Sequence, residues 1–426
     1  MSEKPADSWY EATARRDAPL PALEGDIDAD VCVVGAGLSG CSTALHLAER
    51  GYRVVVLEAE RIGFGASGRS GGQIIPGWAG GMEKIAAQLG KGDAKRVWDF
   101  SIEGVEITRE LILSNRIDCD LAWGHVHAAL KPRQRKELLD WQREQEGEFG
   151  YRKLRFMERE ETESWIASKR YVAGLYDAGA GHLHPLRYTI GVGKAAMAAG
   201  ARICEHSEVT GITNGPTVTV KTAKGSVRAK FVALCANVGH VDLSARLAKK
   251  LIGVASYVIA TKPLGEARAK ALLRDNIAVA DLNWIIDYYR LSADHRMLFG
   301  GRVSYSGVDP LGTRRATRLR MLNVFPQLED VEIDYAWGGM IDITMSRLPN
   351  FGRLEPNVYY LQGFSGHGMI ATTIAGRLCA EAIAGQAERF DVMARIRHHD
   401  FPGGALFRRP SLVLAMTWFR LRDLMP

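Results

Sequence analysis

A glycine-rich turn between two apolar segments is the feature that most restricts how this chain of 426 residues can fold. The apolar run 31–34 leads into a G-x-G-x-x-G turn that begins at Gly35. An alanine-rich helical pattern follows, and a second apolar run ends at Glu58. This order of strand, glycine turn, helix, strand and acid predicts a βαβ unit that binds a dinucleotide, whereas the glycine spacing alone would be a weak signal.

Each residue type in this unit has a physical task. Gly35 lets the strand turn sharply, Gly37 lets the backbone approach a pyrophosphate, and Gly40 lets the helix pack closely on the sheet. The N–H groups and the positive end of the helix attract the phosphates. Glu58, eighteen positions after Gly40, is placed to accept hydrogen bonds from ribose hydroxyls. The binding residues predicted from this unit are Gly35, Ala36, Gly37, Leu38, Ser39, Gly40 and Glu58.

A second glycine-rich loop, at 61–73, favours a flavin dinucleotide over a nicotinamide dinucleotide. It reads RIGFGASGRSGGQ and follows the ribose acid directly, where a flavin needs backbone to pass close to its ring system. The arrangement resembles the D-amino-acid-oxidase-like flavoprotein superfamily of amine oxidases, with its S-G-x-x-G-G loop. It is most similar to the gamma-glutamylputrescine oxidases, whose E-A-x-R-I-G-F-G-A-S-G-R-x-G-G-Q is nearly reproduced here.

The resemblance implies further contacts to an FAD that is bound non-covalently. A late strand leads into a glycine loop, G-x-x-G-H-G at 363–368, and then a helix, whose positive end would face the pyrimidine side of the flavin. Covalent attachment is not expected, because Ser346 and Arg347 stand before Leu348 where a cysteine would be needed. The residues added by the resemblance are Ala59, Arg61, Ala66, Ser67, Arg69, Gly72, Gln73, Val209, Ala236, Gly363, Gly366, His367, Gly368 and Met369.

These patterns predict an α/β fold with two domains, since 426 residues are too many for one core. One is a Rossmann-like FAD-binding domain of the glutathione-reductase type, and the other is an inserted α+β substrate domain built on an antiparallel sheet. The passage 171–185 is interpreted as turn-rich, and 284–291 as a strand. The expected ranges are 1–90, 151–240 and 331–392 for the FAD-binding domain, 91–150 and 241–330 for the substrate domain, and 393–426 for a C-terminal tail.

Composition and charge exclude several classes of partner. The hydrophobic content of 46% is that of a soluble globular protein, and the net charge of +6 comes without a basic block that would predict nucleic-acid binding. Six scattered cysteines predict free thiols, and His125 and His127 lack the further ligands of a metal site. The polar N-terminus predicts a cytoplasmic protein, and the amphipathic tail 412–424 has too few cations for a firm membrane signal.

Aromatic residues, a histidine and an arginine are the candidate substrate contacts. Tyr257 and Tyr288 suit an aromatic slot for an alkyl amine, although aromatic strand residues are also ordinary core residues. Arg302 is the candidate carboxylate clamp, with an ordinary surface ion pair as the alternative. Arg347 is interpreted as a brace for its own loop, and the resemblance makes His367 a ring-contacting residue. The candidate catalytic residues are therefore His367, Arg302, Tyr257 and Tyr288.

The activity that the resemblance implies is the FAD-dependent oxidation of a primary amine. Hydride passes from the α-carbon of the neutral amine to flavin N5, and the imine hydrolyses to an aldehyde and ammonia. The expected small-molecule substrate is γ-glutamylputrescine or a related γ-glutamyl amine. The segment 297–301 lacks the lysine that sarcosine oxidases use in the reaction with oxygen, so the acceptor is O2, a quinone or a carrier protein. The oligomeric state stays open.

Three other functions share part of this pattern. A D-amino-acid or proline-type flavin dehydrogenase that passes electrons to a quinone or carrier would keep the flavin domain but need a tighter carboxylate site. An NAD-dependent dehydrogenase would purify without flavin absorption. A flavin-binding assembly subunit without enzymatic activity would bind a flavin that no amine bleaches. Turnover on a panel of amines and amino acids distinguishes these functions from an amine oxidase.

Overall fold

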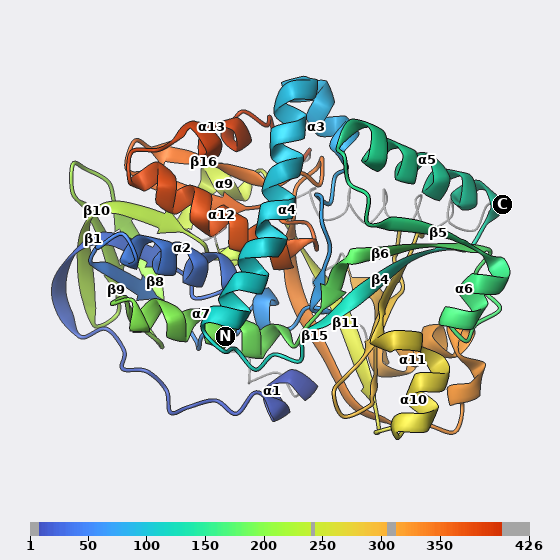
Figure 1. Cartoon of the computed structure of the whole chain (residues 1–426). Helices are drawn as coiled ribbons and strands as arrows, with labels where there is room; N and C mark the ends of the chain where they lie inside the picture. Colours follow the sequence, from blue (N-terminus) through green and yellow to red (C-terminus); the bar gives the residue numbers. More distant parts are fainter. Residues whose placement is uncertain (1–7, 240–242, 305–311, 403–426) are drawn as a thin grey trace.

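The computed structural model describes residues 8–239, 243–304 and 312–402, and these form two β-sheets with helices packed on them. Figure 1 shows the first sheet on the left, around β1 and β10, and the second on the right, around β4, β5 and β6. The long helix α4 (Lys91–Ser114) stands between these groups of strands. This arrangement confirms the predicted α/β class with a Rossmann-like part and a second sheet domain.

The first sheet is parallel at its centre, in the order β17-β10-β1-β2-β7. Its middle strands are buried on both faces, as their continuous apolar runs predict, and all four residues of β2 are buried. Antiparallel β16 extends it beside β17, and an antiparallel pair, β8 and β9, is joined to it through β10. The strands are β1 (Gly25–Val34), β2 (Val54–Leu57), β7 (Arg202–Cys204), β8 (Val209–Thr213), β9 (Val218–Thr222), β10 (Gly225–Leu234), β16 (Asn350–Glu355) and β17 (Val358–Gln362).

Helix α2 (Leu38–Ala48) is the central helix of this half and is buried along its whole length. It packs between α7 (Pro185–Ala198) and α12 (Gly368–Ile383), and the Ser42 hydroxyl donates a 2.7 Å hydrogen bond to the Thr373 carbonyl of α12. The helix expected after the first glycine turn and the helix expected after the G-x-x-G-H-G segment are thus present, as α2 and α12. The remaining helices here are α3 (Met82–Leu89), α9 (Ala245–Ala248), α13 (Glu388–Ala394), η1 (Ala66–Gly68) and η2 (Asn237–Gly239).

The second sheet has the order β15-β11-β14-β13-β12-β4-β6-β3, with β5 beside β6, and its pairs are antiparallel except for β12 with β4. Its strands are β3 (Gln73–Ile74), β4 (Ala122–Ala129), β5 (Leu154–Glu158), β6 (Ala173–His182), β11 (Ile252–Thr261), β12 (Ala278–Asp281), β13 (Tyr288–Leu291), β14 (Met297–Ser304) and β15 (Ile333–Ile343). Its helices are α5 (Pro132–Glu148), α6 (Arg159–Trp165), α10 (Glu266–Leu272), α11 (Thr313–Val324), η3 (Arg274–Asn276) and η4 (Pro326–Leu328).

The passage 171–185 corrects one prediction, because its glycines mark a strand rather than a run of turns. Most of it is β6, which pairs with both β4 and β5. A Cβ on Gly181 would lie 2.3 Å from the Ala122 carbonyl oxygen, so this glycine permits a close approach between strands. Strand β13 likewise begins at Tyr288, and residues 284–287 before it form a loop.

Sheet membership also differs from the expected domain ranges. Residues 154–182 and 333–343 were grouped with the FAD-binding domain, yet they supply β5, β6 and β15 to the second sheet. The chain therefore crosses between the sheets more often than the expected ranges imply. The tail 412–424 lies outside the described residues. Within the described part, no helix is both long and apolar enough to cross a membrane.

The leader before β1 is bound to the second sheet through a short helix, α1 (Trp9–Thr13). Trp9 and Tyr10 are 2% and 0% exposed and pack against Leu298 and Trp337. The buried Arg290 donates a 3.1 Å hydrogen bond to the Tyr10 hydroxyl and a 2.8 Å hydrogen bond to the Gly71 carbonyl. The leader therefore covers apolar surface and is linked through one side chain to the second glycine loop.

Candidate functional site

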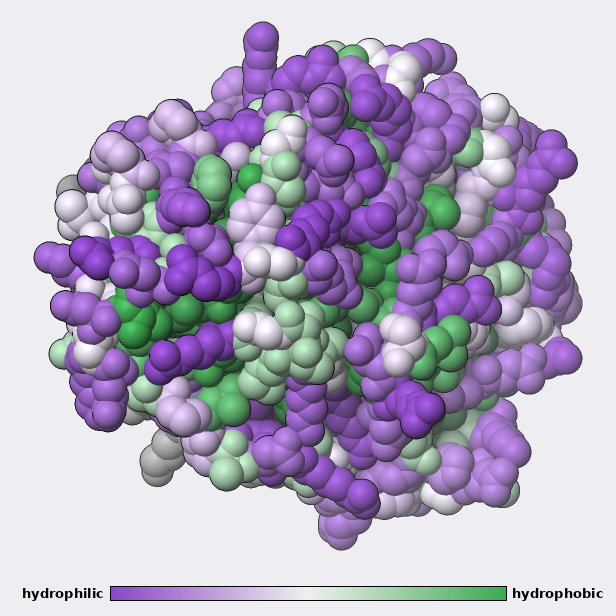
Figure 2. Space-filling model, turned by 60° about the vertical axis from the view of Figure 1, so that its left-hand side comes forward, coloured by the Kyte–Doolittle hydropathy of each residue, from purple (hydrophilic) through white to green (hydrophobic). Residues whose placement is uncertain are grey.

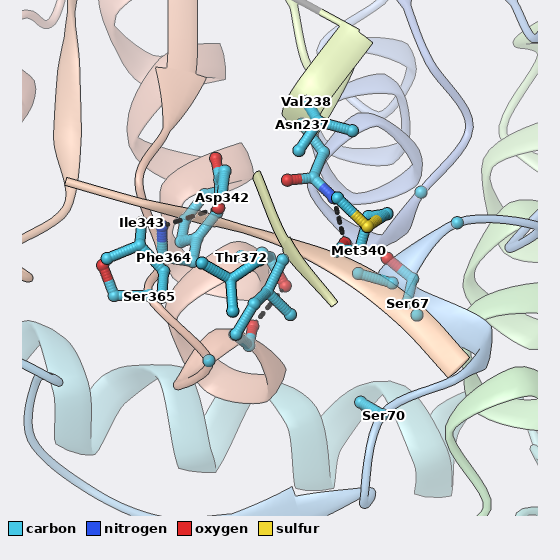
Figure 3. A pocket seen from close by; sticks show the side chains of 18 of the residues that line it. Ser67, Ser70, Asn237, Val238, Met340, Asp342, Ile343, Phe364, Ser365 and Thr372 are labelled. Atoms are coloured by element: carbon cyan, nitrogen blue, oxygen red, sulfur yellow. Dashed lines mark hydrogen bonds between the residues drawn. The ribbon is translucent and has the colours of Figure 1, made fainter. Parts of the chain in front are cut away.

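A cavity of about 1250 Å³ is lined by residues of both sheets and joins the two glycine-rich segments. It is larger than the roughly 300–1,000 Å³ of a pocket for a drug-sized ligand, so it has room for a dinucleotide together with a substrate. The first glycine turn lines one end, and the 364–369 loop lines another part. Figure 3 shows Ser67, Asn237, Met340, Asp342 and Phe364 around this space.

The nucleotide end of the cavity is built from backbone at the start of α2. Gly37 is the N-cap residue and supplies no side-chain cap, and the Leu38 N–H donates a 2.8 Å hydrogen bond to the Ser67 hydroxyl. A Cβ on Gly40 would lie 1.9 Å from the Gly35 carbonyl oxygen, so any larger residue would push the turn and the helix apart. This close turn is what the G-x-G-x-x-G spacing predicted.

Glu58 ends β2 beside the same turn, as predicted. Its carboxylate accepts hydrogen bonds from the N–H groups of Ala36, at 2.6 Å, and Glu60, at 3.0 Å. Burial raises the pKa of Glu58, and these two hydrogen bonds oppose the rise. The acid is thus fixed at the turn and lines the cavity, where a ribose would pass.

Glu205 is a site residue that the sequence analysis did not identify. It follows β7, is 2% exposed and accepts hydrogen bonds from the Leu20 N–H at 2.8 Å and the Ile62 N–H at 2.9 Å. Arg61 donates to it at 3.2 Å, so this predicted cofactor residue holds the loop in place and does not line the cavity. An acid directly after a buried strand was the available signal.

The start of α12 forms the opposite end, and His367 is its N-cap residue. His367 Nε2 lies 2.8 Å from the Ile75 carbonyl oxygen, and because a carbonyl can only accept, Nε2 carries the proton. Burial lowers the pKa of His367, so the imidazole is neutral at pH 7. The side chain is therefore a fixed neutral wall of the cavity rather than a base acting through Nε2.

Asp342 holds the 363–368 loop and was also absent from the predicted residues. It is 3% exposed, and its carboxylate accepts hydrogen bonds from the N–H groups of Gly363, at 2.5 Å, and Phe364, at 3.2 Å (Figure 3). The Ser365 N–H donates to its backbone carbonyl at 3.0 Å. Burial raises the pKa of Asp342 to about 6, against the effect of the two N–H groups. The loop geometry thus depends on one buried carboxylate.

The substrate side of the cavity is mostly aromatic and aliphatic. The ring of Tyr288 lies where a Cβ on Gly71 or Gly300 would stand, and its hydroxyl is 3.3 Å from the Ser256 hydroxyl. Burial raises the pKa of Tyr288 to about 12, so the phenol is neutral. The loop before it brings Trp284 and Ile286 to the cavity wall.

Most of the predicted site residues meet at this cavity, and five of those that the structure describes in full do not line it. Tyr257 is buried against Gly338 in the strand pair β11–β15, and of Arg302 the structure describes only the backbone, opposite Tyr257 in β14. The predicted residues that line the cavity are Gly35, Gly37, Leu38, Ser39, Glu58, Ala59, Ala66, Ser67, Arg69, Gly72, Gln73, Val209, Ala236, Tyr288, Gly366, His367, Gly368 and Met369. Those that do not are Ala36, Gly40, Arg61, Tyr257 and Gly363, and the side chain of Arg302 lies outside the described part of the structure.

In the described part of the chain, the large apolar side chains that are exposed are Leu113, Ile286, Leu319 and Met345. On the face shown in Figure 2 the surface is largely hydrophilic, with separate hydrophobic areas. Large apolar side chains that are exposed in the described part include Ile286, at 36%, and Met345, at 51%, and both line the cavity. All six cysteines are buried and free. The described residues contain no cluster of His, Cys, Asp or Glu side chains that could hold a metal ion.

The residues at the two ends of the cavity fit an FAD. Two long helices, α2 and α12, begin at its wall with N-cap residues, Gly37 and His367, whose own side chains cap no N–H group, so each presents its positive end to the space. Anionic groups are favoured at such ends: the pyrophosphate at α2 and the electron-rich pyrimidine side of a flavin at α12. The glycines at the α2 turn leave no Cβ between backbone and ligand.

Comparison with known proteins agrees with this fit. Residues 30–382 match the family model described as FAD dependent oxidoreductase. The gamma-glutamylputrescine oxidoreductase of Escherichia coli is 43% identical over 98% of both chains, and the probable oxidoreductase OrdL of Haemophilus influenzae is 39% identical over 98% of this chain and 97% of its own. The crystal structure of glycine oxidase from Geobacillus kaustophilus superposes with a TM-score of 0.74 at 20% identity, over 87% of this chain and 99% of its own. The chain belongs to the family of FAD-dependent oxidoreductases.

Proposed function

We propose that the protein oxidises a primary amine, γ-glutamylputrescine or a related γ-glutamyl amine, to an imine that hydrolyses to an aldehyde and ammonia. The observation that carries the proposal is that one cavity, among the described residues, holds the start of α2 at the nucleotide turn, the start of α12 at His367, and an aromatic wall. The similarity to a gamma-glutamylputrescine oxidoreductase over nearly the whole chain supports the choice of substrate.

The residues of the chain divide the work between binding and electrostatics. When bound, FAD supplies the redox chemistry, accepting hydride from the carbon that bears the amine. The start of α2 would hold the pyrophosphate, and the start of α12 would stabilise negative charge on the pyrimidine side of the cofactor. Tyr288 and Trp284 flank an alkyl chain and exclude water from the reacting carbon. His367 keeps its proton on Nε2, which is bound to the Ile75 carbonyl, so this nitrogen does not take a proton from the amine, and the amine must reach the reacting position in its neutral form.

Anaerobic reduction of the purified yellow protein tests this function. We expect γ-glutamylputrescine to bleach the flavin absorption within the mixing time of a stopped-flow experiment, with putrescine slower and glycine, D-alanine and L-proline slower still. Adding O2 or a soluble quinone to the reduced enzyme then identifies the acceptor by the rate of reoxidation. Bleaching by an amino acid in preference to every amine would replace the proposal with the amino-acid dehydrogenase alternative, and no bleaching by any compound would reject an enzymatic role.

A further inference from the structure

Two arginines line the cavity in the part of the chain that the structure describes, and they differ in their surroundings. Arg69 belongs to the second glycine loop, where its guanidinium lies 4.4 Å from the centroid of the Phe64 ring. Its carbonyl accepts a 3.0 Å hydrogen bond from the Trp337 indole. Arg69 is thus part of the flavin-binding loop, whereas Arg347 comes from the turn after β15 on the substrate side.

The turn that carries Arg347 is held at both ends. The Arg347 N–H donates a 3.0 Å hydrogen bond to the Thr344 carbonyl, and the Thr344 hydroxyl donates a 2.7 Å hydrogen bond to the carbonyl of the fully buried Leu348. Arg347 has a φ of 65°, in the left-handed region that a residue with a long side chain rarely adopts. Strained backbone of this kind persists where the surroundings fix it, and it is concentrated at ligand sites.

The guanidinium of Arg347 lies over the Trp284 ring, at 5.7 Å from the centroid. Both residues line the cavity, so the indole holds the cation at its wall. Arg347 is also close to the start of α12: burial is the main cause that lowers the pKa of His367, and the charge of Arg347 lowers it further. The cation therefore stands at the substrate side of the cavity, where its charge acts on His367.

The loop that presents Trp284 is itself fixed. The buried Asp281 carboxylate accepts 3.1 Å hydrogen bonds from the N–H groups of Asn283 and Asp287. Arg320 donates to the Asp287 carboxylate at 2.6 Å and to the Ile285 carbonyl at 3.0 Å. Since the loop is tied at its start, middle and end, Trp284 is a rigid support rather than a mobile side chain. A cation on a rigid aromatic support is well suited to bind an anion in one orientation.

We propose that Arg347, supported by Trp284, binds the α-carboxylate of the γ-glutamyl group and so makes the enzyme select amines that carry a distal carboxylate. This assignment rests on the proposed function and gives Arg347 the role that the sequence analysis gave to Arg302. A guanidinium binds a carboxylate through two parallel hydrogen bonds, and a half-buried site strengthens both. The amine end of the substrate then extends along Tyr288 toward the flavin.

Two substrates that differ in the carboxylate test the assignment. γ-Glutamylputrescine and N-acetylputrescine share the primary amine, the butyl chain and the amide, and the second lacks the carboxylate together with the α-carbon, its amino group and one methylene. In Arg347→Gln we expect KM for γ-glutamylputrescine to rise about 30-fold to 100-fold, as for the loss of a charged hydrogen-bonded pair. Turnover of N-acetylputrescine should change less than about threefold. In Arg347→Lys, the KM for γ-glutamylputrescine should lie between the values for the wild type and for Arg347→Gln. The ratio of kcat/KM for the two substrates does not depend on the fraction of the enzyme that is folded.

A matched control is Arg274→Gln, because Arg274 also lies over a tryptophan, 5.0 Å from the Trp165 ring, but does not line the cavity. It should leave both substrates unchanged. Equal losses of kcat on both substrates in Arg347→Gln, or a shifted flavin spectrum, would assign Arg347 to the cofactor and overturn the inference. Selective loss in Arg302→Gln instead would also overturn it. A wild-type enzyme inactive on both amines would reject the proposed function, and this inference with it.

Discussion

The two ends of the cavity are built in different ways. At the nucleotide end, a continuous stretch from β1 to β3 supplies most of the wall, largely through backbone N–H groups and missing Cβ atoms. At the substrate end, side chains come from β11, from the loop before β13 and from the turn after β15, which are far apart in the sequence. The difference teaches that the cofactor end depends on backbone conformation, and the substrate end on side chains held by long-range hydrogen bonds.

Among the substitutions that test this comparison, Gly40→Ala is expected to have the largest effect. The added methyl group would lie 1.9 Å from the Gly35 carbonyl oxygen, which belongs to backbone and cannot rotate away. We expect the free energy of unfolding to fall by more than about 3 kcal/mol, and the purified protein to contain little FAD. Urea unfolding and the flavin-to-protein absorbance ratio measure the two effects.

Gly92→Ala is the matched control, because nothing lies within 4 Å of a Cβ at this position in α4. It should retain FAD and be stabilised by up to about 1 kcal/mol, as expected for Gly to Ala in a helix. If Gly40→Ala bound FAD as well as Gly92→Ala does, the nucleotide end would not depend on the close turn, and the comparison between the two ends would fail.

The sequence predicts the nucleotide end well because the requirements there are local. The glycine spacing, the acid at the end of β2 and the second glycine loop follow from backbone geometry that neighbouring residues impose. The pattern misses Glu205 and Asp342, since their partners lie more than 20 positions away in the chain or in another element. It also wrongly predicts turns where β6 lies, because a sequence pattern does not distinguish a glycine that permits close approach between strands from a glycine in a turn.

Asp342→Ala tests the side-chain end of the comparison. It removes the acceptor for the Gly363 and Phe364 N–H groups in a buried loop, so we expect the free energy of unfolding to fall by about 2 kcal/mol. The loop at the start of α12 should loosen, and FAD should dissociate faster on dilution. Asp342→Asn retains one acceptor oxygen and should recover part of both effects. Equal FAD dissociation rates in wild type and Asp342→Ala would show that the loop holds its shape without this carboxylate.

The pH dependence of stability gives the smallest and most specific test. The pKa of Asp342 is raised to about 6 in the folded protein by burial, above its usual value near 4, so the folded state binds a proton that the unfolded state has released between these pH values. The Asp342 contribution to the free energy of unfolding therefore falls as pH rises from about 4 to 6, by up to about 1.4 kcal/mol per pH unit. Asp342→Asn, which carries no ionisable group, should lack this contribution.

A substitution of Asp177 is the control that distinguishes an effect specific to the cavity from the effect that any buried carboxyl group has on the pH dependence of stability. Burial also raises its pKa to about 6, but its carboxylate accepts from the Tyr151 hydroxyl and the Gly179 N–H in the second sheet, away from the cavity lining. Asp177→Asn should remove a similar pH-dependent contribution and leave FAD retention unchanged, whereas Asp342→Asn should alter both. If the two variants changed FAD retention equally, the loop at α12 would be coupled to the whole second sheet, and the substrate end could not be treated as a separately fixed set of side chains.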